Sequence, residues 1–275
     1  MRTGGGGSIR CLERICSLSQ FIAVSRSQGI ATVTINRPDR HNALHPTAHY
    51  ELESCLDALA ADESVRVVIL TGAGDKAFCA GYDLRDNLET GVMDIPSTGF
   101  GGLTFRTDFP HPLIAAVNGV AMGGGFEMAL ACDLLLASTS ARFALPEPKV
   151  GWMALGGGIQ RLPRDIGSKR AMGMILTGRT VDAAEGLSLG FVNEVLAPDA
   201  LMARAQALAE EITACAPLAV RYSKRAFYDS LAQADLARAL DPATYPYAMT
   251  VIESEDGVEG KRAFAERRAP VWTGR

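Results

Sequence analysis

The residues best suited to chemistry are two glutamates, Glu127 and Glu147, and a run of three glycines at 123–125. The glycines follow an apolar, β-branched run at 113–117 that is typical of a buried strand, and they precede a stretch of good helix formers. A strand, a glycine turn and a helix start aim unpaired N–H groups and the positive end of a helix dipole at one point. Glu127 falls in the first turn of that helix. Amides that stabilise an anion beside a candidate general base make up half of an active site.

The glycine run is as typical of close helix–strand packing as of a binding turn, and an acid in a first helical turn is often only a partner of the helix dipole. No Gly-Lys-Ser/Thr follows, which excludes a nucleoside-triphosphate loop, and the GxGxxG spacing of dinucleotide-binding folds is absent. Two more stretches strengthen the chemical interpretation. In the loop at 77–84, Ala80-Gly81 can present another amide, and Glu147 ends the sequence FALPE. Two amides and two carboxylates suit a reaction in which charge builds on a carbonyl oxygen while a proton moves at the adjacent carbons.

Alternating strands and helices are expected to position these groups. Apolar periodicity predicts strands at 21–24, 30–35, 67–70, 113–117, 134–137, 141–145 and 192–196, the first two as a hairpin. It predicts helices at 46–60, 157–162, 167–177, 181–188, 199–215, 217–231 and 257–268. Residues 85–111 have few periodic apolar positions and are typical of a mobile lid loop. The order predicts an α/β core over 19–200 and a helical region over 201–275. Residues 1–18, which contain GGGGS, are expected to be a disordered extension.

The composition is that of a soluble globular protein. The 275 residues are 48% hydrophobic and 21% charged, and their formal net charge is −4, which favours neither nucleic acid nor acidic membranes as a partner. No apolar run approaches the roughly 18 residues that span a bilayer. Six scattered cysteines, of which Cys55, Cys79 and Cys132 have apolar neighbours, suit a reducing compartment. The cytoplasm is therefore expected. The mitochondrial matrix is the alternative, because the arginines near the start weakly resemble a transit peptide.

Three of the four histidines, His41, His45 and His49, follow one another at a spacing of four, which on one helix would suggest metal ligands. Pro46 lies inside the set, so the helix is expected to begin there and to leave His41 outside it. No acid or cysteine joins them at ligand spacing. We therefore expect no metal site.

Seven stretches of this sequence resemble the enoyl-CoA hydratase/isomerase (crotonase) family. They are NRPDRHNAL (36–44), AFCAGYDL (77–84), AAVNGVAMGGGFE (115–127), FALPE (143–147), GGGIQRLPRDIG (156–167), LTGRTVDAAEGLSLGFVNEV (176–195) and EGKRAFAERRAPVWTGR (259–275). The resemblance covers about residues 19–275. It implies an α/β crotonase-like spiral of ββα units, with a C-terminal helical region that builds homotrimers, often paired as hexamers. It also implies an acyl-CoA thioester substrate that carries coenzyme A itself, so that no separate cofactor is needed.

The resemblance also implies roles for the residues already singled out. The backbone amides of Ala80 and Gly124 would form an oxyanion hole for the thioester oxygen as it acquires enolate charge. Glu127 and Glu147 would together hold one water over the Cα=Cβ bond of a 2-enoyl thioester. Glu147 is expected to donate the proton to Cα and Glu127 to activate the water, with the two carboxyl groups titrating as a coupled pair. Many family members with other reactions lack one of these acids, so their joint presence favours hydration or dehydration.

Further substrate contacts are implied by matching positions. These are Ala43, Tyr82, Asp83, Leu84, Gly123, Pro146, Leu155, Lys261 and Phe264, the last two on a helix that sometimes reaches coenzyme A from a neighbouring subunit. Arg37 or Arg40 could meet the phosphates of coenzyme A. Two departures from the family pattern concern the acyl pocket. Tyr82 stands where a small residue is common, and WMAL at 152–155 replaces a frequent proline-glycine turn. These departures affect the identity of the acyl substrate more than the type of reaction.

Four alternatives remain. They are an enoyl-CoA isomerase, an enzyme similar to carnitinyl-CoA dehydratase, an inactive acyl-CoA binder and an RNA-binding relative. RNA binding would need a basic stripe. The helical stretch at 46–63 instead carries the acids Glu51, Glu53, Asp57, Asp62 and Glu63.

Overall fold

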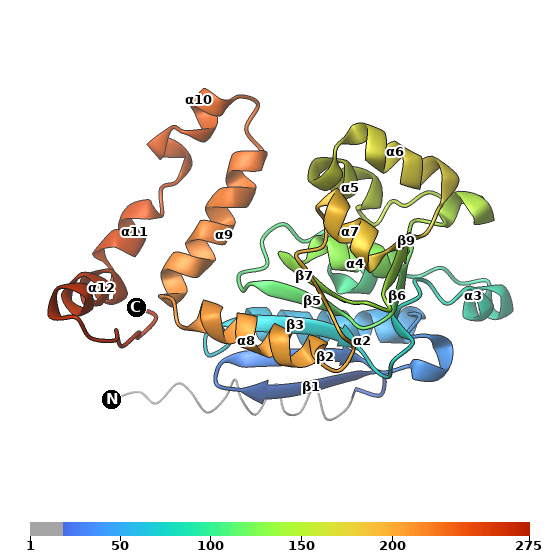
Figure 1. Cartoon of the computed structure of the whole chain (residues 1–275), viewed down its shortest axis with the longest axis horizontal. Coiled ribbons are helices and arrows are strands. Elements are labelled where there is room, and N and C mark those ends of the chain that lie inside the picture. Colours follow the sequence, from blue (N-terminus) through green and yellow to red (C-terminus); the bar gives the residue numbers. More distant parts are fainter. Residues whose placement is uncertain (1–18) are drawn as a thin grey trace.

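The computed structural model describes residues 19–275, so the extension predicted for residues 1–18 lies outside the described residues. An α/β core is followed by a helical C-terminal part, as the sequence predicts (Figure 1). A six-stranded sheet has the order β1-β2-β3-β5-β7-β10, and a four-stranded sheet has the order β4-β6-β8-β9. The strands are β1 (Ile22–Ser27), β2 (Ile30–Ile35), β3 (Val67–Gly72), β4 (Ala77–Cys79), β5 (Leu113–Val117), β6 (Val120–Met122), β7 (Leu134–Ser138), β8 (Arg142–Ala144), β9 (Val181–Asp182) and β10 (Glu194–Leu196).

Successive strands of the chain enter different sheets. The strands β3, β5 and β7 pair in parallel in the larger sheet, and β4, β6 and β8, which follow them in the chain, pair in parallel in the smaller one. A helix comes after each such pair of strands. This repeat confirms the predicted spiral of ββα units. The antiparallel hairpin of β1 and β2, also predicted, closes one edge of the larger sheet.

The helices are α2 (Pro46–Ala60), α3 (Leu84–Thr90), α4 (Gly124–Ala131), α5 (Gly158–Ile166), α6 (Ser168–Thr177), α7 (Ala183–Leu189), α8 (Leu201–Thr213), α9 (Pro217–Leu231), α10 (Leu236–Ala239), α11 (Ala248–Glu253) and α12 (Glu255–Glu266). The prediction for α2 is confirmed at both ends. The prediction of a mobile loop at 85–111 is wrong for much of that segment. It contains α3 and a 3-10 turn, and Phe100, Leu103 and Phe109 are buried in the core.

The larger sheet is covered on both faces. In β3, Val68 and Leu70 belong to the core that includes α2, whereas Val67 and Ile69 pack with α8. Because side chains alternate along a strand, an unbroken apolar run is what a strand between two layers requires. The helix α8, at the start of the region predicted to be C-terminal, therefore covers the core sheet.

The sequence predicted neither a membrane-spanning segment nor a metal site, and residues 19–275 can be examined for both. No helix within residues 19–275 is long and apolar enough to cross a membrane. In that part of the chain no group of three or more His, Cys, Asp or Glu side chains is placed to hold a metal ion. The ring of His45 instead caps the first turn of α2, and His49 is buried and accepts the amide of Gly101. Cys79 and Cys132 lie in the core.

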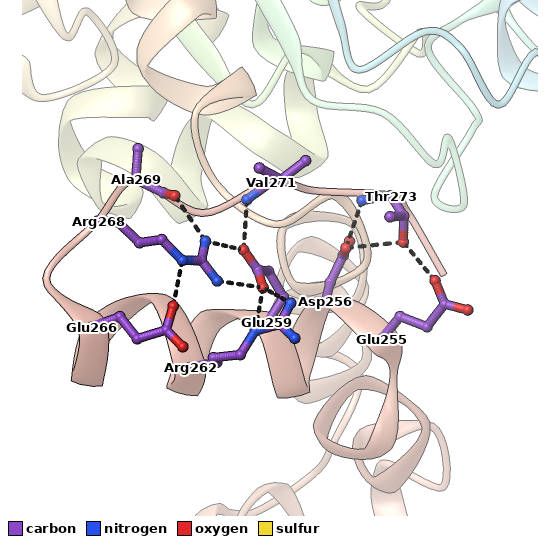
Figure 2. A network of polar contacts seen from close by, with 9 residues as sticks. All are labelled: Glu255, Asp256, Glu259, Arg262, Glu266, Arg268, Ala269, Val271 and Thr273. Carbon is purple, nitrogen blue, oxygen red and sulfur yellow. Dashed lines mark hydrogen bonds and ion pairs between the residues drawn. The ribbon is translucent and has the colours of Figure 1, made fainter.

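The helices α9 to α12 extend away from the core, and the last residues of the chain fold back along α12 (Figure 1). Two acids of α12 hold this tail (Figure 2). Glu259 accepts the guanidinium groups of Arg262 and Arg268 and, at 2.9 Å, the amide of Val271. Asp256 accepts the amide of Thr273 at 2.7 Å. Both ends of the tail are thus bound to one helix.

We expect the Glu259→Gln substitution to release the tail. Hydrogen bonds from Arg268, Val271 and Arg262 hold the pKa of Glu259 well below its usual range. A lowered pKa means that this stabilisation is present above the ordinary value of 4.5 and is lost as the pH falls below it. At pH 7 the amide of Val271, which Glu259 holds, should exchange its hydrogen several-fold faster in the variant than in the parent, and the two rates should converge in acid. Equal rates at pH 7 would contradict the expectation, and Glu266→Gln, which removes only an exposed partner of Arg268, is the control.

Candidate active site

Nine of the thirteen predicted site residues line one cavity of about 390 Å³. They are Ala80, Tyr82, Leu84, Gly123, Gly124, Glu127, Pro146, Glu147 and Leu155. The cavity therefore draws on the loop after β4, the start of α4, the turn after β8 and the loop before α5. Its other lining residues are Gly81, Met93, Ile95, Phe100, Phe105, Val150, Trp152, Met153 and Gly156.

Glu127 lies in the first turn of α4, where its own amide donates to the carbonyl of Gly123 at 2.9 Å. Its side chain is buried, and Oε1 accepts the amide of Gly158 at 2.9 Å. A Cβ at position 156 would lie 2.4 Å from Oε2 of Glu127, so any side chain there would displace the carboxylate. Gly156 and Gly158 together allow Glu127 to be both buried and hydrogen-bonded.

Glu147 begins the 3-10 turn Glu147–Val150, directly after Pro146, and is also buried. A Cβ on Gly123 would lie only 2.8 Å from its Oε1, and Gly123 itself has a φ of +53°, which favours glycine. Within the described part of the chain, Oε2 of Glu147 has no hydrogen-bond partner. The second carboxylate thus packs against the glycine turn that leads into Glu127.

Burial governs the charge of both acids. The pKa of Glu127 is raised to about 7, chiefly by burial and also by the nearby Glu147, while the hydrogen bond from the amide of Gly158 acts to lower it. Burial likewise raises the pKa of Glu147 above its usual range. A coupled pair with raised pKa values can hold one shared proton near neutral pH. Such a pair can give a proton to one atom and take a proton from another.

The structure corrects the assignment of one predicted amide. The N–H of Ala80 donates to the carbonyl of His41 at 3.0 Å, so it cannot also serve a substrate. The next amide on the cavity side is that of Tyr82, which has no acceptor among residues 19–275. The neighbouring Gly81 brings it close to α4, since a Cβ on Gly81 would lie 3.5 Å from the nitrogen of Gly124.

Gly124 is the first residue of α4, so its N–H has no intrahelical acceptor. The amides of Tyr82 and Gly124 are therefore the pair available to polarise a carbonyl oxygen in this cavity. The positive end of the α4 dipole adds to the same effect. The loop motif located the region correctly but not the residue.

The loop after β2 fixes the position of this amide pair. Asn42 has a positive φ of 56°, and its side chain donates to the carbonyl of Ala77 at 2.7 Å and accepts the amide of Arg37 at 2.9 Å. The guanidinium of Arg37 pairs with Asp83 at 3.0 Å. These contacts bind the NRPDRHNAL motif to the strand that leads to Tyr82. Asparagine suits such a position because it tolerates the left-handed region.

Four predicted contacts do not line the cavity. Asp83 is buried, pairs with Arg37 and caps α3, and Ala43 accepts the guanidinium of Arg37 through its carbonyl. Arg37 is therefore engaged within the protein. Lys261 and Phe264 lie on α12, with Phe264 87% exposed, and α12 lies far from α4 in Figure 1. Their contact with coenzyme A stays a prediction.

Sequence reasoning missed part of the apolar wall. Met93 and Ile95 come from the segment between α3 and the 3-10 turn at Phe100–Gly102, and Phe105 follows that turn. None of the three belongs to a periodic pattern. The only signal was the presence of large apolar residues in a stretch otherwise typical of an exposed loop.

The sequence pattern of a protein family described as enoyl-CoA hydratase/isomerase matches residues 25–275. The chain belongs to this family. Members of the enoyl-CoA hydratase/isomerase family use acyl-CoA substrates. The cavity described above contains the two acids that the resemblance implied and one of the two implied amides, that of Gly124.

Solved and curated relatives agree with this membership. An enoyl-CoA hydratase from Mycobacterium tuberculosis H37Rv is 39% identical with a TM-score of 0.88, and the match covers 94% of this chain and 100% of that one. An enoyl-CoA hydratase from Bacillus anthracis is 36% identical with a TM-score of 0.85, over 93% of this chain and 100% of that one. A carnitinyl-CoA dehydratase from Citrobacter koseri is 38% identical over 94% of this chain and all of the relative. The chain is similar to proteins with two different names.

Proposed function

We propose that this protein adds water across the Cα=Cβ bond of a 2-enoyl-CoA thioester, or catalyses the reverse dehydration. The observation that carries the proposal is the meeting of Glu127 and Glu147 with the amides of Tyr82 and Gly124 at one cavity. An isomerase or an inactive binder does not need both buried acids. Enoyl-CoA hydratases and carnitinyl-CoA dehydratases, the two kinds of relative, are both named for reactions of CoA thioesters.

In the proposed reaction the carbonyl oxygen of the thioester accepts hydrogen bonds from the amides of Tyr82 and Gly124. Water loses a proton to one carboxylate and its oxygen attacks Cβ, and the π electrons move through Cα onto the carbonyl oxygen. The enolate collapses as Cα takes a proton from the other carboxylic acid. The reverse reaction passes through the same steps. Each amide contributes about 3–4 kcal/mol to the barrier reduction if it behaves as oxyanion-hole donors usually do.

We assign the base to Glu127 and the acid to Glu147. Oε1 of Glu127 accepts the amide of Gly158, which favours the ionised form. Glu147 has a buried oxygen without a donor, which favours its protonated form. Burial raises the pKa of both acids, so this division rests on the hydrogen bonds and not on the size of the pKa shifts.

Dehydration of carnitinyl-CoA is a second candidate. The specific observation in its favour is the aromatic lining, in which Tyr82 and Trp152 have ring centroids 6.4 Å apart and Phe100 and Phe105 also take part. A quaternary ammonium group is attracted to the faces of aromatic rings. This would make the same acids and amides act on a charged acyl group.

Purified protein tested with crotonyl-CoA, longer trans-2-enoyl-CoAs and carnitinyl-CoA examines both candidates. We expect the absorbance of the conjugated enoyl thioester to fall when water is added to it. No change with any 2-enoyl-CoA would overturn the first candidate, and formation of that absorbance from carnitinyl-CoA would support the second.

The oligomeric state and the division of the chain at residues 200–201 are also proposals. The helices α9, α10 and α11 contain no buried residue, and they expose Phe227, Leu236 and Met249. Exposed apolar side chains of this kind favour association of identical chains, as trimers or hexamers. A cytoplasmic location is proposed on the basis of the cysteine pattern. Sedimentation equilibrium tests the first of these proposals.

A further inference from the structure

One wall of the cavity is the lid segment, residues 91–96, which lies between α3 and the following 3-10 turn. The hydroxyl of Tyr82 donates to the carbonyl of Val92 at 3.2 Å and accepts the amide of Asp94 at 3.3 Å. The hydroxyl of Tyr50, on α2, donates to the carboxylate of Asp94 at 2.8 Å. In the described chain these three hydrogen bonds are the ones that join the lid segment to elements beyond its flanking helical turns. Two tyrosine hydroxyls therefore hold the lid segment in place.

The ring of Tyr82 is itself held on two sides. It stacks on His49 with centroids 5.6 Å apart, and it meets Trp152 edge-on. The Tyr82 backbone pairs with Leu44 in an isolated bridge. A side chain fixed in this way can place its hydroxyl at one point. The tyrosine pKa values are raised, for Tyr50 chiefly by its hydrogen bond to Asp94 and for Tyr82 by burial, so both hydroxyls stay protonated and can donate.

The lid segment presents apolar side chains to the cavity. Met93 and Ile95 line it, and Met93 is 59% exposed. Met153 and Leu155, two further lining residues, are also more than half exposed. The charged side chains lining the cavity are Glu127 and Glu147, the proposed acid and base. This surface offers no partner to a phosphate, but it offers apolar contact to a hydrocarbon chain.

We propose that Tyr82 determines the acyl-chain preference by holding Met93 and Ile95 against the substrate, which favours uncharged 2-enoyl chains longer than four carbons. The inference rests on the proposed function. The backbone amide of Tyr82 polarises the thioester at one end of the acyl group. Its hydroxyl positions the wall that contacts the other end.

The Tyr82→Phe, Tyr50→Phe double substitution tests the proposal. Both changes keep the ring, and the first keeps the backbone amide, so only the hydroxyls are lost. Each methylene withdrawn from water favours binding about fourfold, and a loosened lid segment should lose contact with about two methylenes of an octenoyl chain. We expect the kcat/KM for trans-2-octenoyl-CoA, divided by that for crotonyl-CoA, to fall about tenfold, mainly through a higher KM. Hydrogen exchange at residues 91–95 should become faster.

The control is Tyr245→Phe, which removes a hydroxyl that donates to the carbonyl of Ala239 in the C-terminal part. It should change neither the ratio nor the exchange. The inference is overturned if the ratio is unchanged in the double variant, or if the parent enzyme prefers carnitinyl-CoA to octenoyl-CoA. In both cases the proposed hydro-lyase function still stands. A parent enzyme inactive on every 2-enoyl-CoA overturns the proposed function and the chain preference with it. The exchange rates would then still decide whether the hydroxyls hold the lid segment.

Discussion

Replacing Glu147 by glutamine should lower kcat for hydration by about 10²–10⁴-fold while leaving KM within a few-fold of the parent value. Glutamine has the same shape but cannot deliver a proton to Cα. The amides of Tyr82 and Gly124 remain, so the thioester still binds and is still polarised. Steady-state kinetics with crotonyl-CoA measure both constants.

The exposed Glu63→Gln variant is the matched control, because it removes one carboxylate outside the cavity. A parent-like rate in the Glu147 variant would show that hydration needs only Glu127. The same comparison separates the alternatives. An isomerase that needs one base should keep its activity in one of the two variants, Glu127→Gln or Glu147→Gln. A hydratase should lose its activity in both.

Replacing Glu127 by glutamine should stabilise the fold at pH 8 while it abolishes most of the activity. The native pKa of about 7 lies above the ordinary 4.5, chiefly because of burial. The unfolded chain therefore loses this proton more easily, and stability falls as the pH rises between those two values. Above pH 7 the penalty is about 3 kcal/mol, and glutamine removes it. The hydrogen bond from the amide of Gly158 then has a neutral acceptor in place of a charged one, which costs about 1 kcal/mol and leaves a gain of about 2 kcal/mol.

Calorimetric melting curves at pH 8 and pH 5 test this result. A gain of about 2 kcal/mol corresponds to a rise in melting temperature of about 5 °C. At pH 5 the native acid is already protonated, so the difference should nearly vanish. A destabilised variant at pH 8 would indicate that the hydrogen bond to Gly158 contributes more than the buried charge costs. The Glu63→Gln control should show no such dependence on pH.

The regular elements could be predicted because their signals are local. The helix α2 begins at Pro46 and repeats its apolar residues at helical spacing, so both of its ends were predicted. The mixture of buried strands and helices gave the fold class. The segment at 85–111 could not be predicted in the same way. Phe100 and Phe109 are buried although they lie in a stretch without regular periodicity. The helix α3 contains no buried residue that would produce an apolar stripe.

The two acids of the candidate site could be predicted from the sequence, but one of its two amides could not. Glu127 and Glu147 stand in motifs whose context predicts a shared cavity, and the structure brings them to one. The oxyanion amide was assigned to Ala80, two residues before Tyr82. The direction of that N–H depends on His41, whose carbonyl takes the amide of Ala80. That contact joins residues far apart in the chain and leaves no periodic trace in the sequence.

Tyr82 combines two proposed roles that place different demands on the residue. An N–H group belongs to every amino acid except proline, so the proposed chemistry tolerates almost any residue at this position. The phenol, by contrast, is replaceable. A library randomised at position 82 alone should therefore retune which thioesters are accepted while retaining the reaction, which would make this single codon a route by which the scaffold acquires new metabolic roles.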